Sequence, residues 1–142
     1  MALTDTEQQF LAGQRQGRLA TVAPGGGPQV KPVGFSYNLE LGSIDISGFN
    51  MGQSAKYRNV RRNPKVAFVV DEVRFPGPEG VRFLEIRGVA EALADRAAAA
   101  PGLAPEIVRI HPRRVVSYNL DPEHPGLQAR VVEPHPVRPE VA

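Results

Sequence analysis

Cysteine is absent from the sequence, which excludes a disulfide framework, a thiolate nucleophile and thiolate metal ligands. A reducing intracellular compartment is therefore permitted. No apolar run approaches the length of a membrane span, and residues 1–11 contain Asp5 and Glu7 and lack the apolar core of a signal peptide. We find no internal repeat. These absences predict a cytoplasmic protein without a membrane partner.

Length and charge narrow the class further. The 142 residues, 42% of them hydrophobic, suit one compact domain. The net charge of +2 is too small to attract nucleic acid globally. Positive charge is concentrated instead within ten residues that contain no acid, and these carry Lys56, Arg58, Arg61, Arg62 and Lys65. Basicity this local is typical of a binding site.

A strand, a turn and a helix precede and enclose this basic run. Residues 44–47 alternate between isoleucine and polar residues, the period of two expected of a half-buried strand. A helix is expected over residues 53–63, because no residue breaks it before Pro64. Two residues are plausible N-caps for it, Asn50 and Gly52.

Lys56 is the unusual residue of this helix. It lies in or next to the first turn, where free N–H groups and the helix dipole already make the potential positive. A cation there becomes favourable when an anion is held jointly by the backbone, the Ser54 hydroxyl and the Lys56 ammonium. The alternative is a solvated basic face, and the spacing alone does not decide between the two.

Six strands are expected in total, at residues 18–22, 29–39, 44–47, 65–71, 81–93 and 107–118. The last is either one strand kinked at Pro112 or two short ones. A first helix capped by Thr4 or Asp5 and a short helical turn over residues 95–100 complete the elements. Six short strands with one helix between the third and the fourth indicate a small antiparallel barrel, mainly β with minor α.

Glycine and proline modify three of these segments. Pro32 lacks an N–H, so that side of the second strand faces an edge, a gap or a ligand. Gly88 marks a bulge in the fifth strand. The tail from Asp121 carries five prolines and is not expected to pair continuously, so roughly its last ten residues should be poorly ordered. We therefore divide the chain into a barrel domain, residues 1–120, and a proline-rich tail, residues 121–142.

Six segments carry a resemblance to a known family: residues 17–22, 28–35, 44–48, 56–60, 63–67 and 110–115. Together they resemble the pyridoxamine 5′-phosphate oxidase-like split-barrel superfamily, and within it the actinobacterial branch that uses the deazaflavin coenzyme F(420). The block Lys56-Tyr57-Arg58-Asn59-Val60 followed by Asn63-Pro64 is fairly specific to that branch. The resemblance covers about residues 5–120 and implies a Greek-key split barrel of the FMN-binding type.

The resemblance also implies a homodimer with two cofactor sites at the subunit interface. Ser54 and Lys56 match the family's phosphate-binding pair, and the ring system should lie against the second strand. The full set of cofactor-binding residues that it implies is Lys31, Pro32, Val33, Ser47, Gly48, Gln53, Ser54, Lys56, Tyr57, Arg58 and Arg61. Two residues depart from the pattern: Ala55 stands where many relatives have a second basic residue, and Tyr118 where close relatives usually carry Trp.

The sequence itself also favours a dimer. Val66, Phe68, Val70, Leu84 and Ile86 belong to strands that are apolar on both faces, and such strands need a partner surface. A six-stranded barrel of this size is also too thin to bury a tricyclic ring alone.

Few side chains are expected to act chemically. A deazaflavin delivers a hydride from its own ring, so no catalytic residue is required. His111, next to Pro112, is a possible proton donor, although a histidine in a strand turn is more often structural. Asp71 and Glu72 are adjacent and point to opposite faces, which argues against an acid/base pair. No metal site is expected, since His124 and His135 lie among prolines without ligands at suitable spacing.

Three function classes remain. The first is an F(420)H₂-dependent reductase acting on a conjugated acceptor: an enone, a quinone, a biliverdin-like tetrapyrrole or a polyketide such as a tetracycline precursor. The second is an FMN-dependent oxidase or flavin-binding protein of the same fold, because Ser54-x-Lys56 does not distinguish the two cofactors. The third is a nucleic-acid or regulatory module, disfavoured by the low net charge and by Tyr57 being the one aromatic residue of the basic run.

Overall fold

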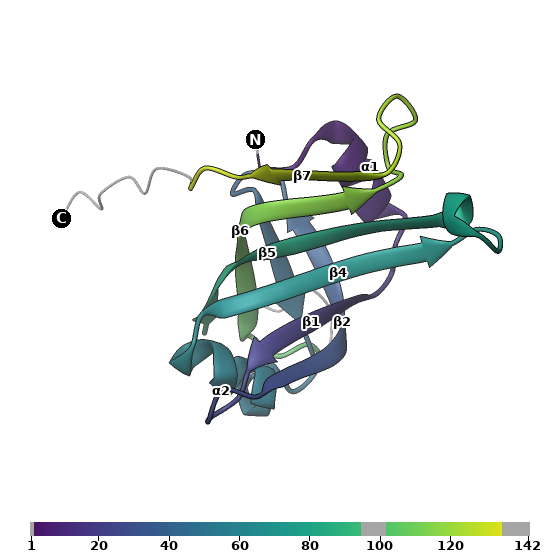
Figure 1. Cartoon of the computed structure of the whole chain (residues 1–142). Helices are drawn as coiled ribbons and strands as arrows, with labels where there is room; N and C mark the ends of the chain where they lie inside the picture. The colour runs from purple at the N-terminus through teal and green to yellow at the C-terminus, as the bar shows by residue number, and fades with distance from the viewer. Residues whose placement is uncertain (1, 95–101, 135–142) are drawn as a thin grey trace.

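The structure is a computed structural model that describes residues 2–94 and 102–134. Strands dominate it, and two α-helices and two short 3₁₀ helices accompany them (Figure 1). In chain order the elements are α1 (Asp5–Ala12), β1 (Gly17–Val22), β2 (Pro28–Asn38), β3 (Ser43–Ser47), η1 (Met51–Gln53), α2 (Ala55–Arg62), β4 (Lys65–Val73), η2 (Pro78–Gly80), β5 (Val81–Leu93), β6 (Ile107–Tyr118) and β7 (Leu127–Val131). No helix of the described part has both the length and the apolar character needed for a membrane crossing.

The strands form a closed antiparallel barrel. Their order in the sheet is β3-β2-β1-β4-β5-β6-β7, and β3 also pairs with β6, which closes the first six strands into a ring. Two meanders, β1-β2-β3 and β4-β5-β6, are joined by the segment that contains α2, a Greek-key connection. The six-stranded barrel expected from the sequence is therefore confirmed, with α2 between the third and the fourth strand.

The barrel interior is filled by alternate residues of the strands. Five of these are Val66, Phe68, Val70, Leu84 and Ile86, and each is at most 7% exposed within the single chain. They face the core of their own barrel, so these five side chains do not themselves support a partner surface. On the outside of the barrel β4 carries Ala67 and Val69, whereas β5 carries the ion pair of Glu85 and Arg87.

Gly17, at the start of β1, allows the backbone to pass close to the ring of Phe68. A Cβ atom on Gly17 would lie 2.4 Å from the ring of Phe68, so no larger residue fits without moving that ring. Phe68 in turn packs edge-on against Phe35 of β2, with 5.1 Å between the ring centres.

β6 is one continuous strand, which resolves the alternative left open around Pro112. Its first half pairs with β3 and its second half with β7. The register between β5 and β6 shifts at Arg87 and Gly88, which confirms the expected bulge. Gly88 is required there because a Cβ atom would lie 2.1 Å from the carbonyl oxygen of His111.

β7 was not anticipated from the sequence. It pairs with β6 from Leu127↔Tyr118 to Val131↔Arg114. The tail was not expected to pair continuously, and this strand forms where Pro125 and Pro134 flank a proline-free stretch that is long enough for five residues of ladder. The helical turn expected at 95–100 lies outside the described residues, as does most of the last ten residues.

α1 and β7 lie together at the end of the barrel opposite α2 (Figure 1). Thr4 caps α1 through a reciprocal capping box with Glu7, as expected. Arg130 of β7 forms an ion pair with Glu7 and donates a hydrogen bond of 2.9 Å to the carbonyl oxygen of Ala2. The last described strand therefore holds the first helix in place.

One buried ion pair spans the closure of the barrel. Arg109 of β6 donates to both carboxylate oxygens of Asp45 on β3, at 3.0 and 3.1 Å. Burial alone would raise the pKa of Asp45, but hydrogen bonds from Arg109, Ser43 and Asn38 outweigh burial and hold that pKa below its ordinary value. This pair contributes stability above the unfolded pKa of about 3.8, and the contribution is lost as the pH falls through the lower folded value.

Arg109→Met should lower the free energy of unfolding by about 3–5 kcal/mol at neutral pH, because it leaves the Asp45 carboxylate buried without its partner. Chemical denaturation measures the change, and the gap to the parent should narrow as acid protonates Asp45. Arg18→Met is the control, since its ion pair with Asp71 is about half exposed and should be worth less than about 1 kcal/mol. Equal effects of the two variants would contradict a structural role for the buried pair.

Candidate functional site

A groove of about 480 Å³ runs along β2 and the end of β3, beside the start of α2. We call it the β2 groove. It is lined by Pro32, Val33, Gly34, Phe35, Ser36, Ser47, Gly48, Phe49, Lys56 and Leu103. The segment that bears Leu103 is held against β3 by a hydrogen bond of 3.0 Å from the Ala104 N–H to the Gly48 carbonyl oxygen.

The floor of the β2 groove is flat because of three residues on the outer side of β2. Pro32, Gly34 and Ser36 alternate with Val33 and Phe35, which belong to or pack against the core. A Cβ atom on Gly34 would meet no atom within 4 Å, so the space above this glycine is open. A planar molecule can therefore lie close to the β2 backbone here.

α2 begins two residues later than a cap at Gly52 would place it, and four residues later than a cap at Asn50 would. The N-cap is Ser54, whose hydroxyl accepts the Tyr57 N–H at 3.3 Å and donates to the Met51 carbonyl oxygen at 2.6 Å. The sequence analysis was wrong about the cap because residues 51–53 form the 3₁₀ turn η1 before the α-helix starts. Within the described part, no partner is found for the N–H groups of Ala55 and Lys56.

Buried polar contacts fix α2 against the barrel. The Asn59 amide donates to Thr21 Oγ1 at 3.0 Å and to Gln29 Oε1 at 2.8 Å, which ties the helix to the β1–β2 hairpin. The Tyr57 hydroxyl donates to the Leu93 carbonyl oxygen of β5 at 3.2 Å. The helix start is therefore held at a set position relative to the groove floor.

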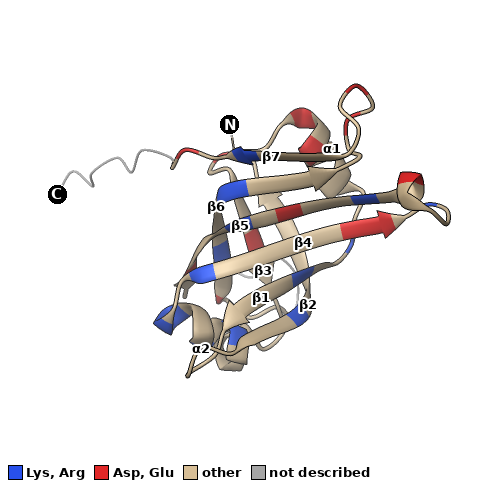
Figure 2. Ribbon diagram, viewed as in Figure 1, with Lys and Arg blue, Asp and Glu red and all other residues tan. Residues whose placement is uncertain are grey.

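Two lysines make the α2 end of the groove positive. Burial lowers the pKa of the Lys56 ammonium below its ordinary value, and the nearby charge of Lys31 lowers it further. Among residues 2–94 and 102–134, neither ammonium makes a hydrogen bond or an ion pair. Figure 2 shows Lys and Arg positions on α2 and β2, and acids on α1 and the far end of β4. This arrangement favours an anion between the two lysines.

The structure brings five of the residues expected at the site together in the groove: Pro32, Val33, Ser47, Gly48 and Lys56. Lys31 lies beside them, close enough to lower the pKa of Lys56. Ser54 does not line the groove; it is the N-cap of α2 and so fixes the start of the helix that carries Lys56.

The remaining expected residues lie apart from the groove. The Tyr57 side chain is buried under α2, and Arg61 is exposed in its last turn. The Arg58 guanidinium turns back to the Gln53 carbonyl oxygen at 2.7 Å. His111 faces a different hollow and contacts the Glu91 carboxylate at 2.7 Å.

Five groove residues were missed by the sequence analysis: Gly34, Phe35, Ser36, Phe49 and Leu103. The small residues Gly34 and Ser36, at alternate positions after Pro32, could have predicted the flat floor from the sequence. Phe49 is 78% exposed at the rim of the groove, an unusual position for a phenylalanine in a single chain. Leu103 gave no signal, because it comes from a segment distant in sequence.

Residues 3–138 match the family model described as pyridoxamine 5′-phosphate oxidase. The chain belongs to this family. A curated relative from Streptomyces rimosus, described as 5a,11a-dehydrotetracycline/5a,11a-dehydrooxytetracycline reductase, is 44% identical over 132 residues, which cover 92% of this chain and 93% of the relative.

Solved structures share the family fold. A conserved hypothetical protein of Mycobacterium tuberculosis superposes with a TM-score of 0.67 at 21% identity, covering 83% of this chain and 86% of that one. A protein described as F(420) reductase gives 0.60 at 24% identity, with 80% and 98% covered. An FMN-binding protein of Nostoc punctiforme gives 0.60 at 13% identity, with 89% and 91% covered.

Gly34→Ala should raise the free energy of unfolding by about 0.5–1 kcal/mol, because a strand glycine carries an entropic cost and the added methyl meets no atom. Thermal or denaturant unfolding of the ligand-free chain measures it. Gly17→Ala is the matched control and should lose about 1–3 kcal/mol, since its methyl would overlap the Phe68 ring. A loss at Gly34 of the same size would mean that the groove floor is packed rather than open.

Proposed function

We propose that the chain is an F(420)H₂-dependent reductase that passes a hydride to a conjugated organic acceptor of polyketide type, in the cytoplasm. The observation that carries the proposal is the β2 groove, which combines a flat floor with a pair of lysines that lack an anionic partner among the described residues. The 44% identity to a dehydrotetracycline reductase supports the reaction and the acceptor class.

The groove residues suit a deazaflavin at both of its ends. The open space over Gly34 accommodates a planar ring system against β2, and the exposed Phe49 ring covers its rim. At the other end, the N–H groups of Ala55 and Lys56 and the Lys56 ammonium are available to the cofactor phosphate. Lys31 adds a second positive charge at the same place.

The reduced cofactor supplies the hydride from its own ring when it is bound, so the chain needs no nucleophile. Its residues bind and orient: Lys56 and the α2 N-terminus hold the anionic end, and the β2 backbone sets the height of the ring above the floor. Phe49 and Leu103 make the rim apolar and keep water from the reacting face.

FMN is the alternative cofactor, because the shorter flavin phosphate fits the same pair of lysines. Titration of the purified chain with F(420) and with FMN, followed by fluorescence, tests the proposal directly. Binding of F(420) at micromolar concentration with much weaker FMN binding is expected. Tighter FMN binding would favour a flavin oxidase. If neither cofactor binds, both the F(420)-dependent reductase and the FMN-dependent oxidase are refuted.

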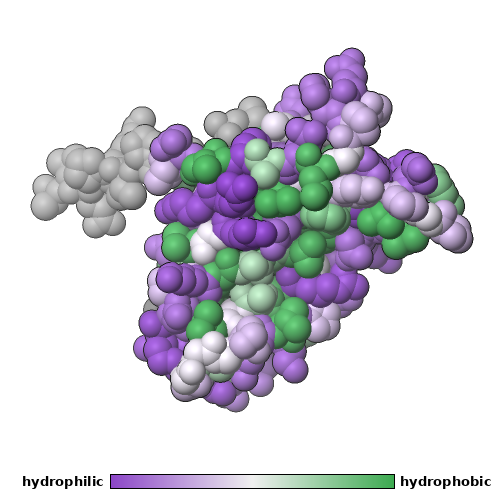
Figure 3. Space-filling view, viewed as in Figure 1, coloured by the Kyte–Doolittle hydropathy of each residue, from purple (hydrophilic) through white to green (hydrophobic). Residues whose placement is uncertain are grey.

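A homodimer is part of the proposal. The residues named for it in the sequence analysis lie in the core, so we place the dimer surface on the outer face of β4–β7 instead. The outer face of β4–β7 carries apolar residues on neighbouring strands, which include Val69, Phe83, Val116, Tyr118, Leu127, Ala129 and Val131. Phe83 and Tyr118 stack with 5.7 Å between ring centres, and Leu127 and Val131 are 65% and 68% exposed. Figure 3 shows hydrophobic residues across this face between polar ones. We propose that a second copy of the chain covers it.

Lys56→Ala should weaken F(420) binding by about 1.5–3 kcal/mol, the scale of a charge-assisted hydrogen bond. Ligand-free stability should stay level or rise slightly. The folded pKa of Lys56 is lowered, so its charged form costs stability below that pKa, and the cost disappears as the pH rises through it. Fluorescence titration and thermal unfolding at neutral pH measure the two effects.

Arg58→Ala is the control for this variant, because its guanidinium turns away to the Gln53 carbonyl oxygen. It should change F(420) affinity much less than Lys56→Ala does. If both variants bind like the parent, or if Lys56→Ala unfolds at a clearly lower temperature, Lys56 is a structural residue and the phosphate site is elsewhere.

Leu127→Glu should convert a dimer to a monomer at tens of micromolar without unfolding the chain, because its side chain is exposed in the single copy. Analytical ultracentrifugation with and without cofactor measures the mass. Phe75→Glu is the control, an exposed apolar residue in the loop after β4 that should leave assembly unchanged. A parent chain that sediments as a monomer with cofactor present would refute the dimer.

A further inference from the structure

A second hollow, of about 570 Å³, lies between α1 and the end of β2. We call it the α1 trough. It exists because β2 is longer than its neighbour: the β1–β2 ladder ends at Gly17↔Val33, while β2 continues to Asn38 and pairs there with β3. Before Gly17 the chain leaves the sheet as the loop from α1. One edge of residues 34–38 therefore faces α1 instead of another strand.

The two walls of the trough differ in chemistry. The α1 wall presents Asp5, Gln8, Gln9 and Ala12, which lie on one face of the helix by their spacing of three and four residues. The Gln8 amide already donates to the Leu3 carbonyl oxygen at 2.9 Å. The β2 wall presents Phe35, Tyr37 and Leu39, alternate residues on one side of the strand and its end. Side-chain amides both donate and accept hydrogen bonds, whereas the other wall offers apolar contact.

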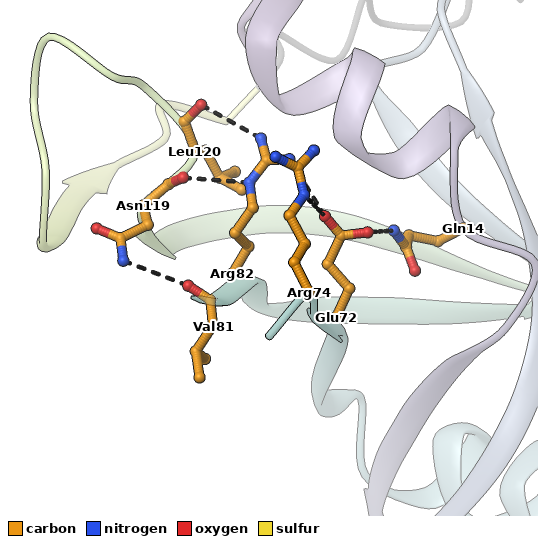
Figure 4. A network of polar contacts seen from close by, with 7 residues as sticks. All are labelled: Gln14, Glu72, Arg74, Val81, Arg82, Asn119 and Leu120. Atoms are coloured by element: carbon orange, nitrogen blue, oxygen red, sulfur yellow. Dashed lines mark hydrogen bonds and ion pairs between the residues drawn. The ribbon is translucent and has the colours of Figure 1, made fainter. Parts of the chain in front are cut away.

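At one end of the trough, a network of charged residues holds the side-chain amide of Gln14. Gln14 Nε2 donates to Glu72 Oε2 at 3.1 Å, and the other oxygen of Glu72 accepts from Arg74 at 3.0 Å and from Arg82 at 3.2 Å (Figure 4). Arg82 also donates to the carbonyl oxygens of Asn119 and Leu120. This network fixes the position of the Gln14 amide before any molecule binds.

The trough and the β2 groove share two lining residues, Phe35 and Ser36. The groove floor is on the outer side of β2 and the trough wall on the side of Phe35 and Tyr37, so the two hollows meet across the edge of residues 34–38 that has no β1 partner. Both volumes fall within the range of about 300–1,000 Å³ that is common for sites of small organic molecules. The two hollows together are large enough for a cofactor ring and a separate partner molecule.

We propose that the α1 trough binds the hydride acceptor, a flat polycyclic molecule with several carbonyl or hydroxyl groups. Its rings contact Phe35, Tyr37 and Leu39, its oxygens bind the amides of Gln9 and Gln14, and its reacting end lies at Phe35 and Ser36. This inference rests on the proposed function, because it places the acceptor relative to a cofactor in the β2 groove.

Ala12→Phe tests the inference by filling the trough. Ala12 is exposed at the end of α1 and lines the trough but not the groove. The expected result is a rise of about tenfold or more in the KM for 5a,11a-dehydrotetracycline, a loss of about 1.4 kcal/mol, with the Kd for F(420) unchanged. The KM for menadione should also stay unchanged, because two rings at the groove do not reach Ala12.

Two further variants complete the test. Gln16→Phe adds the same ring to an exposed position outside the trough and should change neither constant. Leu39→Ala removes apolar contact from the opposite wall, at a side chain that is 70% exposed, and should raise the KM for dehydrotetracycline without lowering stability.

The outcomes separate the inference from the proposed function. Normal F(420) binding and menadione reduction, with an unchanged KM for dehydrotetracycline in Ala12→Phe and Leu39→Ala, would overturn the acceptor site alone. So would a parent chain that does not turn over dehydrotetracycline, or an Ala12→Phe variant whose only defect is loss of the dimer, since a second copy would then cover the trough. Absence of F(420) binding in the parent would overturn both.

Discussion

The contact between β3 and β6 is the constraint on which the site depends. β3 pairs with β2 on one side and with β6 on the other, and the Asp45–Arg109 ion pair spans the second of these edges. The chain passes from β3 through η1 directly into α2. If β3 were free on that edge, the end of β3 that lines the groove would be held by β2 alone. Closure of the barrel therefore determines the geometry of the groove as well as the stability of the fold.

The groove also carries an electrostatic cost. Lys56 is partly withdrawn from water beside Lys31, at a helix end whose free N–H groups are already positive. In the ligand-free chain this arrangement opposes folding, and the buried contacts of Asn59 and Tyr57 offset it from the other side of the helix. An anion bound as proposed would relieve this repulsion.

Sequence patterns predicted the strands well because alternation reports local geometry. The sequence showed that β4 is apolar on both sides, but not which side closes inward, since that depends on pairing with strands far along the chain. Ser54 as the cap and β7 as a strand were missed for related reasons. A 3₁₀ turn preceded the helix, and the β7 ladder forms only once β6 is in place. At the site, the resemblance pointed to β2 and Lys56, whereas Leu103 and the α1 trough arise only from the folded arrangement.

β7 lies outside the closed ring of six strands, yet Arg130 holds both Glu7 and the backbone of Ala2. None of the residues that line the β2 groove comes from β7 or α1. The two ends of the sequence therefore form one unit that borders the trough, and the middle of the sequence forms another that builds the groove. A substitution in α1 can therefore alter the trough without changing any residue that lines the β2 groove.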